Sequence, residues 1–316
     1  MKPAALLAKR ANAIRRIYRQ SLASVVEAPL EPRGRSDLTV YTFSHEGHVP
    51  EQVASLRSLI RHHGVPRRVT VVSDGTHTPE SRRLIERVHP VVSVVDHREV
   101  TRSDLPAPIE AFIASNPIGG KLAMEWSIDI DGPTLYSDAD VLFFSQMANL
   151  PAEEDGRPRF LQDFDTRFLD ARMLEDDGER VPPTNSGLQL LFRRLDWDDA
   201  LARFEAAVDP RSLVPQRYGN TEQTVVHLAM RASGATPLPR DEFVLEVDDE
   251  HDWRDRYGGD GIALRHYCYS DAVQRKLWLN VWDDLADVAR SSPAATVRAL
   301  FASALEWGGD RRNARG

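Results

Sequence analysis

The chain has 316 residues, of which 41% are hydrophobic, and this suffices for one large α/β domain or two smaller ones. The net charge is −8, but the first 26 residues carry six basic side chains and no acidic one, so the remainder carries −14. Such an acidic body argues against nucleic acid as a partner, and an anionic substrate would need a local cation from a basic residue or a metal. Because Cys268 is the single cysteine, an internal disulfide and a cysteine-rich metal site are excluded.

The N-terminal segment, residues 1–26, combines apolar residues at helical spacing with arginines on the opposite face. We expect an amphipathic helix that either packs on the body or rests on an anionic membrane surface. No apolar run approaches the roughly 18 residues of a membrane span, and the segment lacks the apolar core of a signal peptide. We therefore expect a cytoplasmic protein, with any membrane contact peripheral, at the inner face, and made through this segment.

A linker rich in proline, glycine and charge follows at residues 27–37, and strands and helices then alternate. The expected strands are 38–44, 67–75, 91–97 and the β-rich run 134–146, and the expected helices are 50–63, 78–88, 109–115 and 121–127. These strands are continuously apolar, which predicts an α/β fold with a mostly parallel, doubly wound central sheet flanked by helices. In such sheets, ligands bind beyond the carboxyl ends of the strands.

The pattern changes after residue 149, where a polar loop is expected first. The further expected strands are 159–162, 185–194, 242–247 and 261–268, and the further expected helices are 196–208, 220–232, 283–290 and 293–306. We interpret residues 38–307 as one domain with a nucleotide-binding half (38–149), an acceptor half (150–282) and C-terminal helices (283–307). Residues 308–316 are expected to be a flexible tail.

The pattern Asp-x-Asp occurs four times, which is close to chance for a chain with 29 aspartates, so context must separate the matches. The match at 196–198 opens an expected helix, and the match at 129–131 precedes a Gly-Pro turn. The match at 163–165 follows a short strand and remains a competitor that could line the same cleft. Only the match at 138–140 lies between two apolar β-runs, at a rim where two carboxylates can hold a hard divalent cation.

The stretch LYSDADVLFF, residues 135–144, resembles the metal-binding signature of GT-A glycosyltransferases, most closely that of the glycogenin-like retaining group. Four further segments agree in their order along the chain: GGKLAMEWSID, TNSGLQLLF, GNTEQTVVHLA and LRHYC…QRKLW. The resemblance covers roughly residues 38–282. It departs from the group in the longer spacing between His266 and Lys276 and in the absence of the usual glycine between them.

The resemblance implies a nucleotide-sugar donor, most simply a UDP-sugar, and a divalent cation held by Asp138, Asp140 and His266. Mixed carboxylate and imidazole ligands suit Mn²⁺, with Mg²⁺ as the alternative. The residues expected at the donor are Thr42, Phe43, Ser44, Asp74, Lys121, Asp138, Ala139, Asn185, Gly187, Arg275 and Lys276. Residues 42–44 would frame the base, and either Asp74 or Asp96 would reach the ribose. Lys276, with Arg275 as its substitute, would neutralise the phosphates.

Glu222 and Gln223 match the family's acidic–Gln pair near the reacting sugar carbon, so the resemblance makes them the expected catalytic residues. Their spacing from Asn220, a plausible helix cap, also fits a purely structural role in satisfying backbone donors. In a retaining enzyme one of them would lie under the sugar, whereas in an inverting enzyme Glu222 would deprotonate the acceptor. The resemblance favours retention.

The acceptor is left open between a glycan, a lipid-linked molecule and a small molecule. Two other functions are also compatible with the fold. A nucleotidyltransferase would normally need a glycine-rich loop with Arg or Lys after the first strand, and TFSHEGHVPE lacks it. A non-catalytic sugar-nucleotide-binding protein would need neither Glu222 nor the complete metal set.

Overall fold

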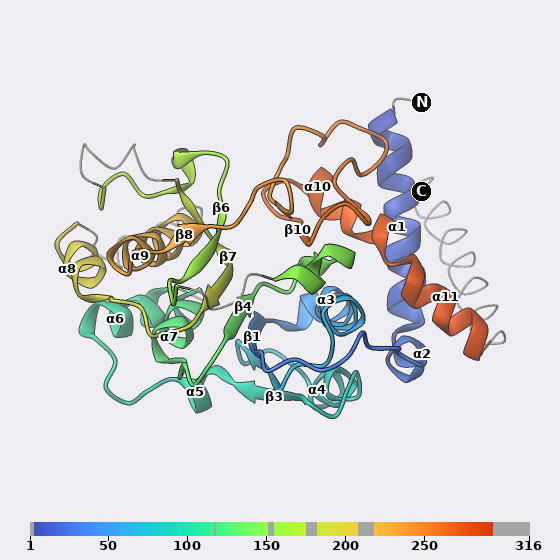
Figure 1. The fold of residues 1–316 in the computed structure, drawn as a ribbon, viewed down its shortest axis with the longest axis horizontal. Coiled ribbons are helices and arrows are strands. Elements are labelled where there is room, and N and C mark those ends of the chain that lie inside the picture. Colours follow the sequence, from blue (N-terminus) through green and yellow to red (C-terminus); the bar gives the residue numbers. More distant parts are fainter. Residues whose placement is uncertain (1–2, 117, 151–154, 175–181, 208–217, 293–316) are drawn as a thin grey trace, which may run out of the picture.

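A seven-stranded sheet forms the centre of the protein in the computed structural model, which describes residues 3–116, 118–150, 155–174, 182–207 and 218–292 (Figure 1). Its strand order is β3-β2-β1-β4-β7-β6-β8. The strands are β1 (Thr39–Ser44), β2 (Arg68–Ser73), β3 (Val92–Asp96), β4 (Thr134–Ser137), β6 (Arg159–Gln162), β7 (Thr184–Leu191) and β8 (Thr236–Pro237). The first four are mutually parallel, and β7 runs antiparallel to β4 and β6, so the expected mostly parallel sheet is confirmed.

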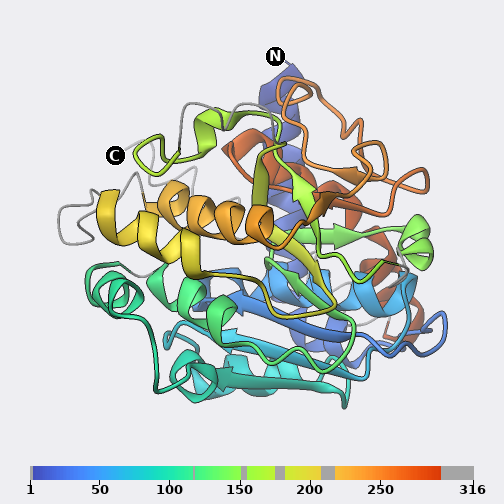
Figure 2. The same ribbon diagram turned by 60° about the vertical axis from the view of Figure 1, so that its left-hand side comes forward.

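Helices cover both faces of this sheet and bury their apolar sides in two hydrophobic cores (Figures 1 and 2). The first face carries α1 (Pro3–Gln20), α2 (Leu22–Glu27), α3 (Val49–His62), α4 (Pro79–Glu86), α10 (Asp271–Lys276) and α11 (Trp282–Ser291). The second face carries α6 (Ala107–Ser115), α7 (Gly119–Ser127), α8 (Asp198–Ala207) and α9 (Tyr218–Ala232). A short α5 (His97–Val100) follows β3, and one-turn 3-10 segments include η1 (Glu46–His48), η3 (Thr166–Phe168) and η7 (Leu277–Asn280).

The parallel register brings the carboxyl ends of four strands to one edge of the sheet. Thr39 pairs with both Arg68 and Thr134, and β2 and β3 continue the same direction. The strands therefore end together at Ser44, Ser73, Asp96 and Ser137, which is the edge where ligands bind in sheets of this kind.

A second sheet of three short strands lies beside this edge, with the order β5-β10-β9. Its strands are β5 (Val141–Phe143), β9 (Phe243–Val244) and β10 (Leu264–His266). The chain passes from β4 of the large sheet to β5 of the small one through the bend at residues 138–140. The β-rich run predicted at 134–146 is thus two strands, because the two aspartates and the intervening alanine leave the ladder to make the turn.

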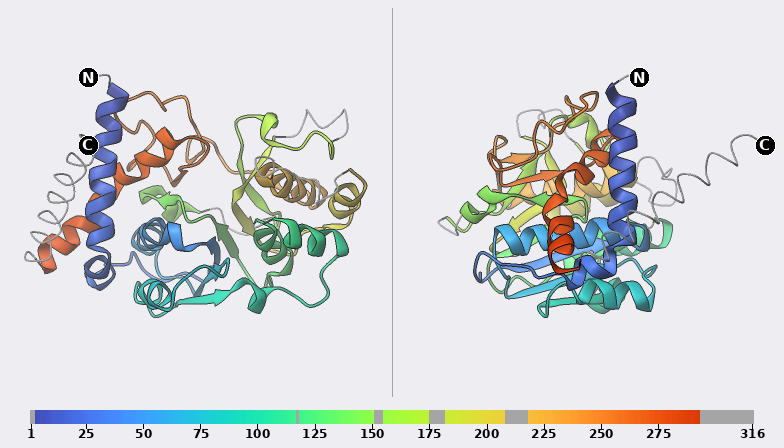
Figure 3. Two further views of the ribbon diagram at one scale, coloured as in Figure 1. Left: turned by 180° about the vertical axis from the view of Figure 1, so that it is seen from behind. Right: turned by 90° about the vertical axis from the view of Figure 1, so that its right-hand side faces the viewer.

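The N-terminal helix α1 packs with its apolar face on the body, beside α2, α10 and η7 (Figure 3). Leu7, Ala11, Ile14 and Tyr18 are all buried. Of the two alternatives for this helix, packing on the body accounts for its apolar residues, and its basic residues face outward. None of the described helices is both long and apolar enough to cross a membrane.

A buried ionic network fastens α1 and α3 to the C-terminal helix α11. Arg57 binds Asp284 at 2.8 Å and Asp287 at 3.2 Å, and Arg61 binds the same two carboxylates at 2.7 and 2.9 Å. The Tyr18 hydroxyl donates to Asp284 at 2.8 Å. Removing one partner of a buried ion pair costs about 3–5 kcal/mol, so this network fixes the position of α1 on the body.

The predicted elements of the first half match the structure to within a few residues; the helix predicted at 78–88, for example, is α4, which Thr78 caps. Two details differ in the second half. The helix α9 begins at Tyr218, so Asn220 lies within its first turn instead of capping it, and α10 was not predicted. Parts of the polar loop, the end of the helix at 196–208, the helix at 293–306 and the tail at 308–316 lie outside the described residues.

Candidate active site

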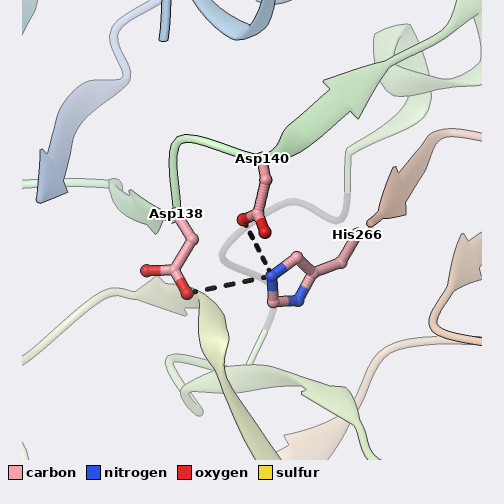
Figure 4. A group of neighbouring side chains, drawn as sticks. All are labelled: Asp138, Asp140 and His266. Carbon is pink, nitrogen blue, oxygen red and sulfur yellow. Dashed lines mark hydrogen bonds and ion pairs between the residues drawn. The ribbon is translucent and has the colours of Figure 1, made fainter. Parts of the chain in front are cut away.

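Asp138, Asp140 and His266 meet at the carboxyl edge of the sheet (Figure 4). Nε2 of His266 lies 3.1 Å from Oδ1 of Asp140 and 3.8 Å from Oδ2 of Asp138. Each residue offers one possible metal-ligand atom, and these three atoms all lie within 4.8 Å of one another. Within the described part of the chain, this is the one group of histidine, cysteine and acidic side chains that could hold a metal ion. Two carboxylates and one imidazole, all pointing into a common space, fit a divalent cation of the Mn²⁺ type.

The small sheet explains why residues 126 positions apart meet. β10 pairs antiparallel with β5, which sets His266 opposite Val141, directly after Asp140. The backbone N–H of Tyr267 also donates to the carbonyl of Asp140 at 3.0 Å. At the other end of the bend, the N–H of Asp138 donates to the carbonyl of Gly187 in β7 at 2.8 Å. The two aspartates are therefore held by both sheets.

Asn185 orients the histidine. The N–H of Gly187 donates to Oδ1 of Asn185 at 2.9 Å, which fixes that atom as the oxygen, and the same Oδ1 lies 3.0 Å from Nδ1 of His266. An amide oxygen only accepts, so Nδ1 must carry the proton, and the lone pair of Nε2 faces the aspartates. The sequence prediction placed Asn185 at the donor; the structure places it behind the imidazole.

Gly187 is needed because the imidazole occupies the space of a side chain at that position. A Cβ atom there would lie 2.2 Å from Cε1 and 2.7 Å from Nδ1 of His266. The glycine thus permits close approach of β7 and His266, which is the reason a glycine suits this point of the strand.

Electrostatics at this group follow from burial and neighbouring charge. Burial alone would lower the pKa of His266, but Cys268 and Asp140 raise it well above its usual value. Burial would raise the pKa of Asp140, and the facing His266 outweighs this and lowers it. The raised pKa puts a proton on Nε2 as well in the free protein, and a cation bound by this nitrogen would displace that proton.

Lys121 of α7 lies on the side of Asp138 that faces α9. Its buried ammonium is 3.2 Å from Oδ1 of Asp138, 3.2 Å from Oγ of Ser186 and 3.5 Å from Oε1 of Glu222. Burial would lower the pKa of Lys121, but Asp138, Glu222 and Glu125 together raise it, so the ammonium is charged. The structure thereby brings Lys121, a predicted donor residue, and Glu222, a predicted catalytic residue, next to the metal-ligand group.

Glu222 is paired with Glu125, a residue that the sequence analysis did not single out. Both carboxyl groups are buried, and burial raises the pKa of each. Glu125 accepts from Nε2 of Gln189 at 2.8 Å, and Glu222 accepts from Oγ of Ser186 at 3.0 Å. Like charge and burial together make it costly for both carboxyls to ionise, and the Lys121 ammonium offsets only one negative charge. A carboxyl on the buried face of α7 carries no sequence signal of its own, which is why it was missed.

Gln223 does not contact Lys121 or Glu125 in any hydrogen bond of the described residues and instead takes part in a second polar cluster with Asp163 and Asn185. Its Nε2 donates to Oδ2 of Asp163 at 3.1 Å, and its Oε1 accepts from Nδ2 of Asn185 at 3.2 Å. The hydroxyl of Tyr269 donates to Asp163. The competing Asp-x-Asp match thus contributes Asp163 to the same site, whereas Asp165 caps η3 and binds Arg167.

Tyr269 lies between His266 and Lys276, three residues after the histidine. It is the one non-glycine residue with a positive φ, 69°, in the described ranges, a conformation that costs on the order of 1–3 kcal/mol. The ring stacks on Phe168, with ring centroids 4.1 Å apart, and remains 36% exposed. The cost is offset by the hydrogen bonds of its hydroxyl to Asp163 and Asn185.

Of the remaining predicted donor residues, Thr42 and Asp74 have hydrogen-bond partners, whereas Ser44 has none for its hydroxyl within the described residues. Thr42 donates to Gln52 at 3.0 Å, the buried Oγ of Ser44 has no hydrogen-bond partner, and Asp74 accepts from the N–H of Thr76 at 2.9 Å. Ala139 is buried within the bend, and Phe43 is partly buried at the end of β1. These residues lie along the predicted edge of the sheet or in the loops that follow it.

Lys276 is not brought to the metal-ligand group. Its ammonium binds Oδ2 of Asp249 at 2.7 Å, the carbonyl of Asp249, and the carbonyl of Arg254 at 3.0 Å. An ammonium has three N–H donors, and three acceptors use all of them. Arg275, its predicted substitute, lines a cavity that Asp140 also lines.

No family model matches the chain, and no curated protein matches it in sequence. Solved structures do resemble it. An active-site mutant of LgtC superposes with a TM-score of 0.50 at 14% identity, covering 78% of this chain and 95% of that one. The galactosyltransferase LgtC with donor and acceptor sugar analogs gives 0.49 at 13%, covering 80% and 95%. Mouse xyloside xylosyltransferase 1 gives 0.44 at 13%, covering 73% and 97%.

The fold is therefore that of the GT-A glycosyltransferases, as the sequence resemblance implied. At 14% identity the likeness concerns the fold alone. The glycogenin-like subgroup stays a prediction, and the activity is argued below from the residues of the site.

Proposed function

We propose that the protein is a metal-dependent glycosyltransferase that moves a sugar from a nucleotide-diphosphate donor, a UDP-sugar, to a hydroxyl acceptor with retention. The observation that carries the proposal is the convergence of Asp138, Asp140 and His266, with Lys121 and Glu222 beside them, at the carboxyl edge of a GT-A sheet.

The three side chains would hold Mn²⁺, or alternatively Mg²⁺, through carboxylate oxygens and Nε2. When bound, such an ion supplies Lewis-acid stabilisation of the diphosphate leaving group. The fit is supported by the hydrogen bond of Asn185 to Nδ1, which directs the Nε2 lone pair toward the carboxylates.

The chain's own residues would bind and orient the sugar. Lys121 places a buried positive charge beside Asp138, at the side where the sugar–phosphate linkage would lie. Glu222 and Gln223 occupy adjacent positions of α9 but face different clusters, one toward Lys121 and one toward Asp163 and Asn185. A carboxylate and an amide oxygen at the sugar stabilise the positive charge that develops on the ring in the transition state.

The acceptor would approach past the exposed stack of Phe168 and Tyr269, since the Tyr269 hydroxyl reaches the Asp163–Gln223 cluster. A glycan, a lipid-linked sugar and a small molecule all present the required hydroxyl. Because the apolar face of α1 is used by the body, its exposed basic residues would make any contact with an anionic inner membrane face.

A nucleotidyltransferase is the second candidate, because the same fold edge and metal set would serve it. The structure favours transfer of a sugar, since the segment after β1 forms η1 and α3 without a glycine-rich phosphate loop. A non-catalytic binder would have no use for the buried Lys121–Glu222 pair.

A thermal-shift screen of nucleotide diphosphates and nucleotide sugars, with and without Mn²⁺, tests the proposal. A ligand present at a concentration of 100 times its dissociation constant stabilises the folded protein by about 2.7 kcal/mol, and the resulting shift in melting temperature is readily measured. We expect stabilisation by a UDP-sugar only when Mn²⁺ is present, followed by slow release of UDP. Stabilisation by a nucleoside triphosphate and no response to any nucleotide sugar would instead favour nucleotidyl transfer.

A further inference from the structure

A cavity of about 240 Å³ is lined by Asp140 of the metal-ligand group and is walled partly by the N-terminal helix. Asn12 and Arg15 of α1 line it together with His48, Asp140 and Arg275. Residues from the two ends of the described chain thus share a cavity with a predicted metal ligand. Figures 1 and 3 show α1 running beside α10, which carries Arg275.

Two guanidinium groups line the cavity, each in an ion pair with a carboxylate that also lines it, and neither ion pair uses all of the guanidinium's N–H donors. Nη2 of Arg15 lies 2.9 Å from Glu51, and Nη2 of Arg275 lies 3.3 Å from Asp271. The arginine side chains are 46% and 37% exposed, and that of Asp271 is 84% exposed, so the second pair is a weak surface contact. Each guanidinium has five N–H donors, and these ion pairs use few of them.

Lys276, which the family resemblance assigned to the phosphates, does not line this cavity. The Lys276 ammonium gives its donors to Asp249 and to the carbonyl of Arg254, inside the C-terminal segment. A diphosphate held at Asp140 would still need positive charge from side chains, because the body of the protein is acidic. Arg15 and Arg275 are the arginines that line the cavity beside Asp140.

We propose that Arg15 of α1 and Arg275 of α10 form the diphosphate-binding wall of the donor site, an inference that rests on the proposed function. A guanidinium binds phosphate oxygens through two parallel hydrogen bonds, which a point charge does not provide. The N-terminal helix is then part of the donor site. Its rigid attachment through Tyr18 and Asp284 holds Arg15 at the cavity.

The test compares Arg15→Gln and Arg275→Gln with Arg10→Gln, which makes the same charge change on an exposed position of the same helix. Calorimetric titrations with UDP and with uridine, each in the presence of Mn²⁺, separate the diphosphate from the base. We expect Arg15→Gln and Arg275→Gln each to weaken UDP about 10- to 100-fold, the loss of charged hydrogen bonds, and to leave uridine unchanged. Arg10→Gln should leave both affinities unchanged, and Arg15→Lys should lie between Arg15→Gln and the wild type.

Equal UDP affinity in Arg15→Gln and Arg10→Gln, with both variants folded by thermal unfolding, overturns the inference while leaving the proposed function standing. If Arg15→Gln unfolds, Arg15→Lys decides, because it retains the charge next to Glu51. A wild-type protein that binds no nucleoside diphosphate with Mn²⁺ overturns the proposed function, and this inference with it.

Discussion

The tight contact between Gly187 and His266 makes Gly187→Ala an informative perturbation of the site. The added Cβ would lie 2.2 Å from Cε1 of His266 and 2.8 Å from Oδ1 of Asn185. Carbon atoms in contact stay about 3.5–4.0 Å apart, so the imidazole must retreat by more than about 1 Å. The ring is only 4% exposed and is held by β10, so it cannot swing aside freely.

We expect two measurable consequences of Gly187→Ala. Overpacking should lower the free energy of unfolding by about 1–3 kcal/mol. Displacing the ring breaks its hydrogen bond with Asn185 and moves Nε2 away from Asp140, so Mn²⁺ affinity should fall at least 10- to 100-fold, roughly the cost of losing such an orienting contact. Thermal unfolding reports the first effect and calorimetric titration with Mn²⁺ the second.

Gly261→Ala is the matched control, because residue 261 precedes the same β10 and a Cβ there would meet no atom within 4 Å. This variant should keep both the stability and the Mn²⁺ affinity of the wild type. Wild-type Mn²⁺ affinity in a folded Gly187→Ala protein would refute the argument that β7 and His266 are fitted to each other for metal binding.

Three further predictions follow from the buried polar clusters. Lys121→Met should lower the free energy of unfolding by about 3–5 kcal/mol, since it strands the buried carboxylate of Glu222 and the partly exposed carboxylate of Asp138, and adding Glu222→Gln should recover part of the loss in the melting temperature. The raised pKa of Glu125 means that the stabilising effect of its proton is complete below the ordinary pKa of a glutamate and is lost as the pH rises through the raised pKa. Relative to the wild type, the melting temperature of Glu125→Gln should therefore rise as the pH is increased above that ordinary value, and an unchanged difference would contradict the raised pKa. Tyr269→Phe keeps the ring stacked on Phe168 but removes the hydroxyl that donates to Asp163. The rate of transfer to an acceptor should therefore fall while Mn²⁺ affinity stays the same. An equal fall in the transfer rate and in Mn²⁺ affinity would argue against a role of Tyr269 on the acceptor side.

The sequence allowed the alternating elements and the sheet to be predicted because continuous apolar strands and capped helices are local signals. The bend at Asp138 and Asp140 was also predictable, since carboxylates are too costly to bury inside an apolar strand and are therefore expected where the strand leaves the sheet. Its pairing with His266 came only from the family resemblance, because the contact depends on β10 lying antiparallel to β5.

The parts of the site that were not predicted depend on tertiary packing. Glu125 is an ordinary residue of an amphipathic helix until the fold buries it against Glu222. In the sequence, Arg15 is indistinguishable from the other basic residues of α1. Its place at the cavity follows only from the packing of that helix beside α10. Lys276 fitted the motif, and its burial against Asp249 could not be read from residue order.

Titration of the protein with Mn²⁺ by calorimetry, comparing the wild type with Asp140→Ala and Asp165→Ala, tests the central claim most directly. Asp165 belongs to the competing Asp-x-Asp match but caps η3 and binds Arg167. Asp165→Ala is therefore the control variant, because it also removes one carboxylate but not one from the metal-ligand group. We predict one Mn²⁺ site in the wild type and in Asp165→Ala, and none in Asp140→Ala. Retained Mn²⁺ binding in a folded Asp140→Ala protein would contradict the assignment of the ion to Asp138, Asp140 and His266.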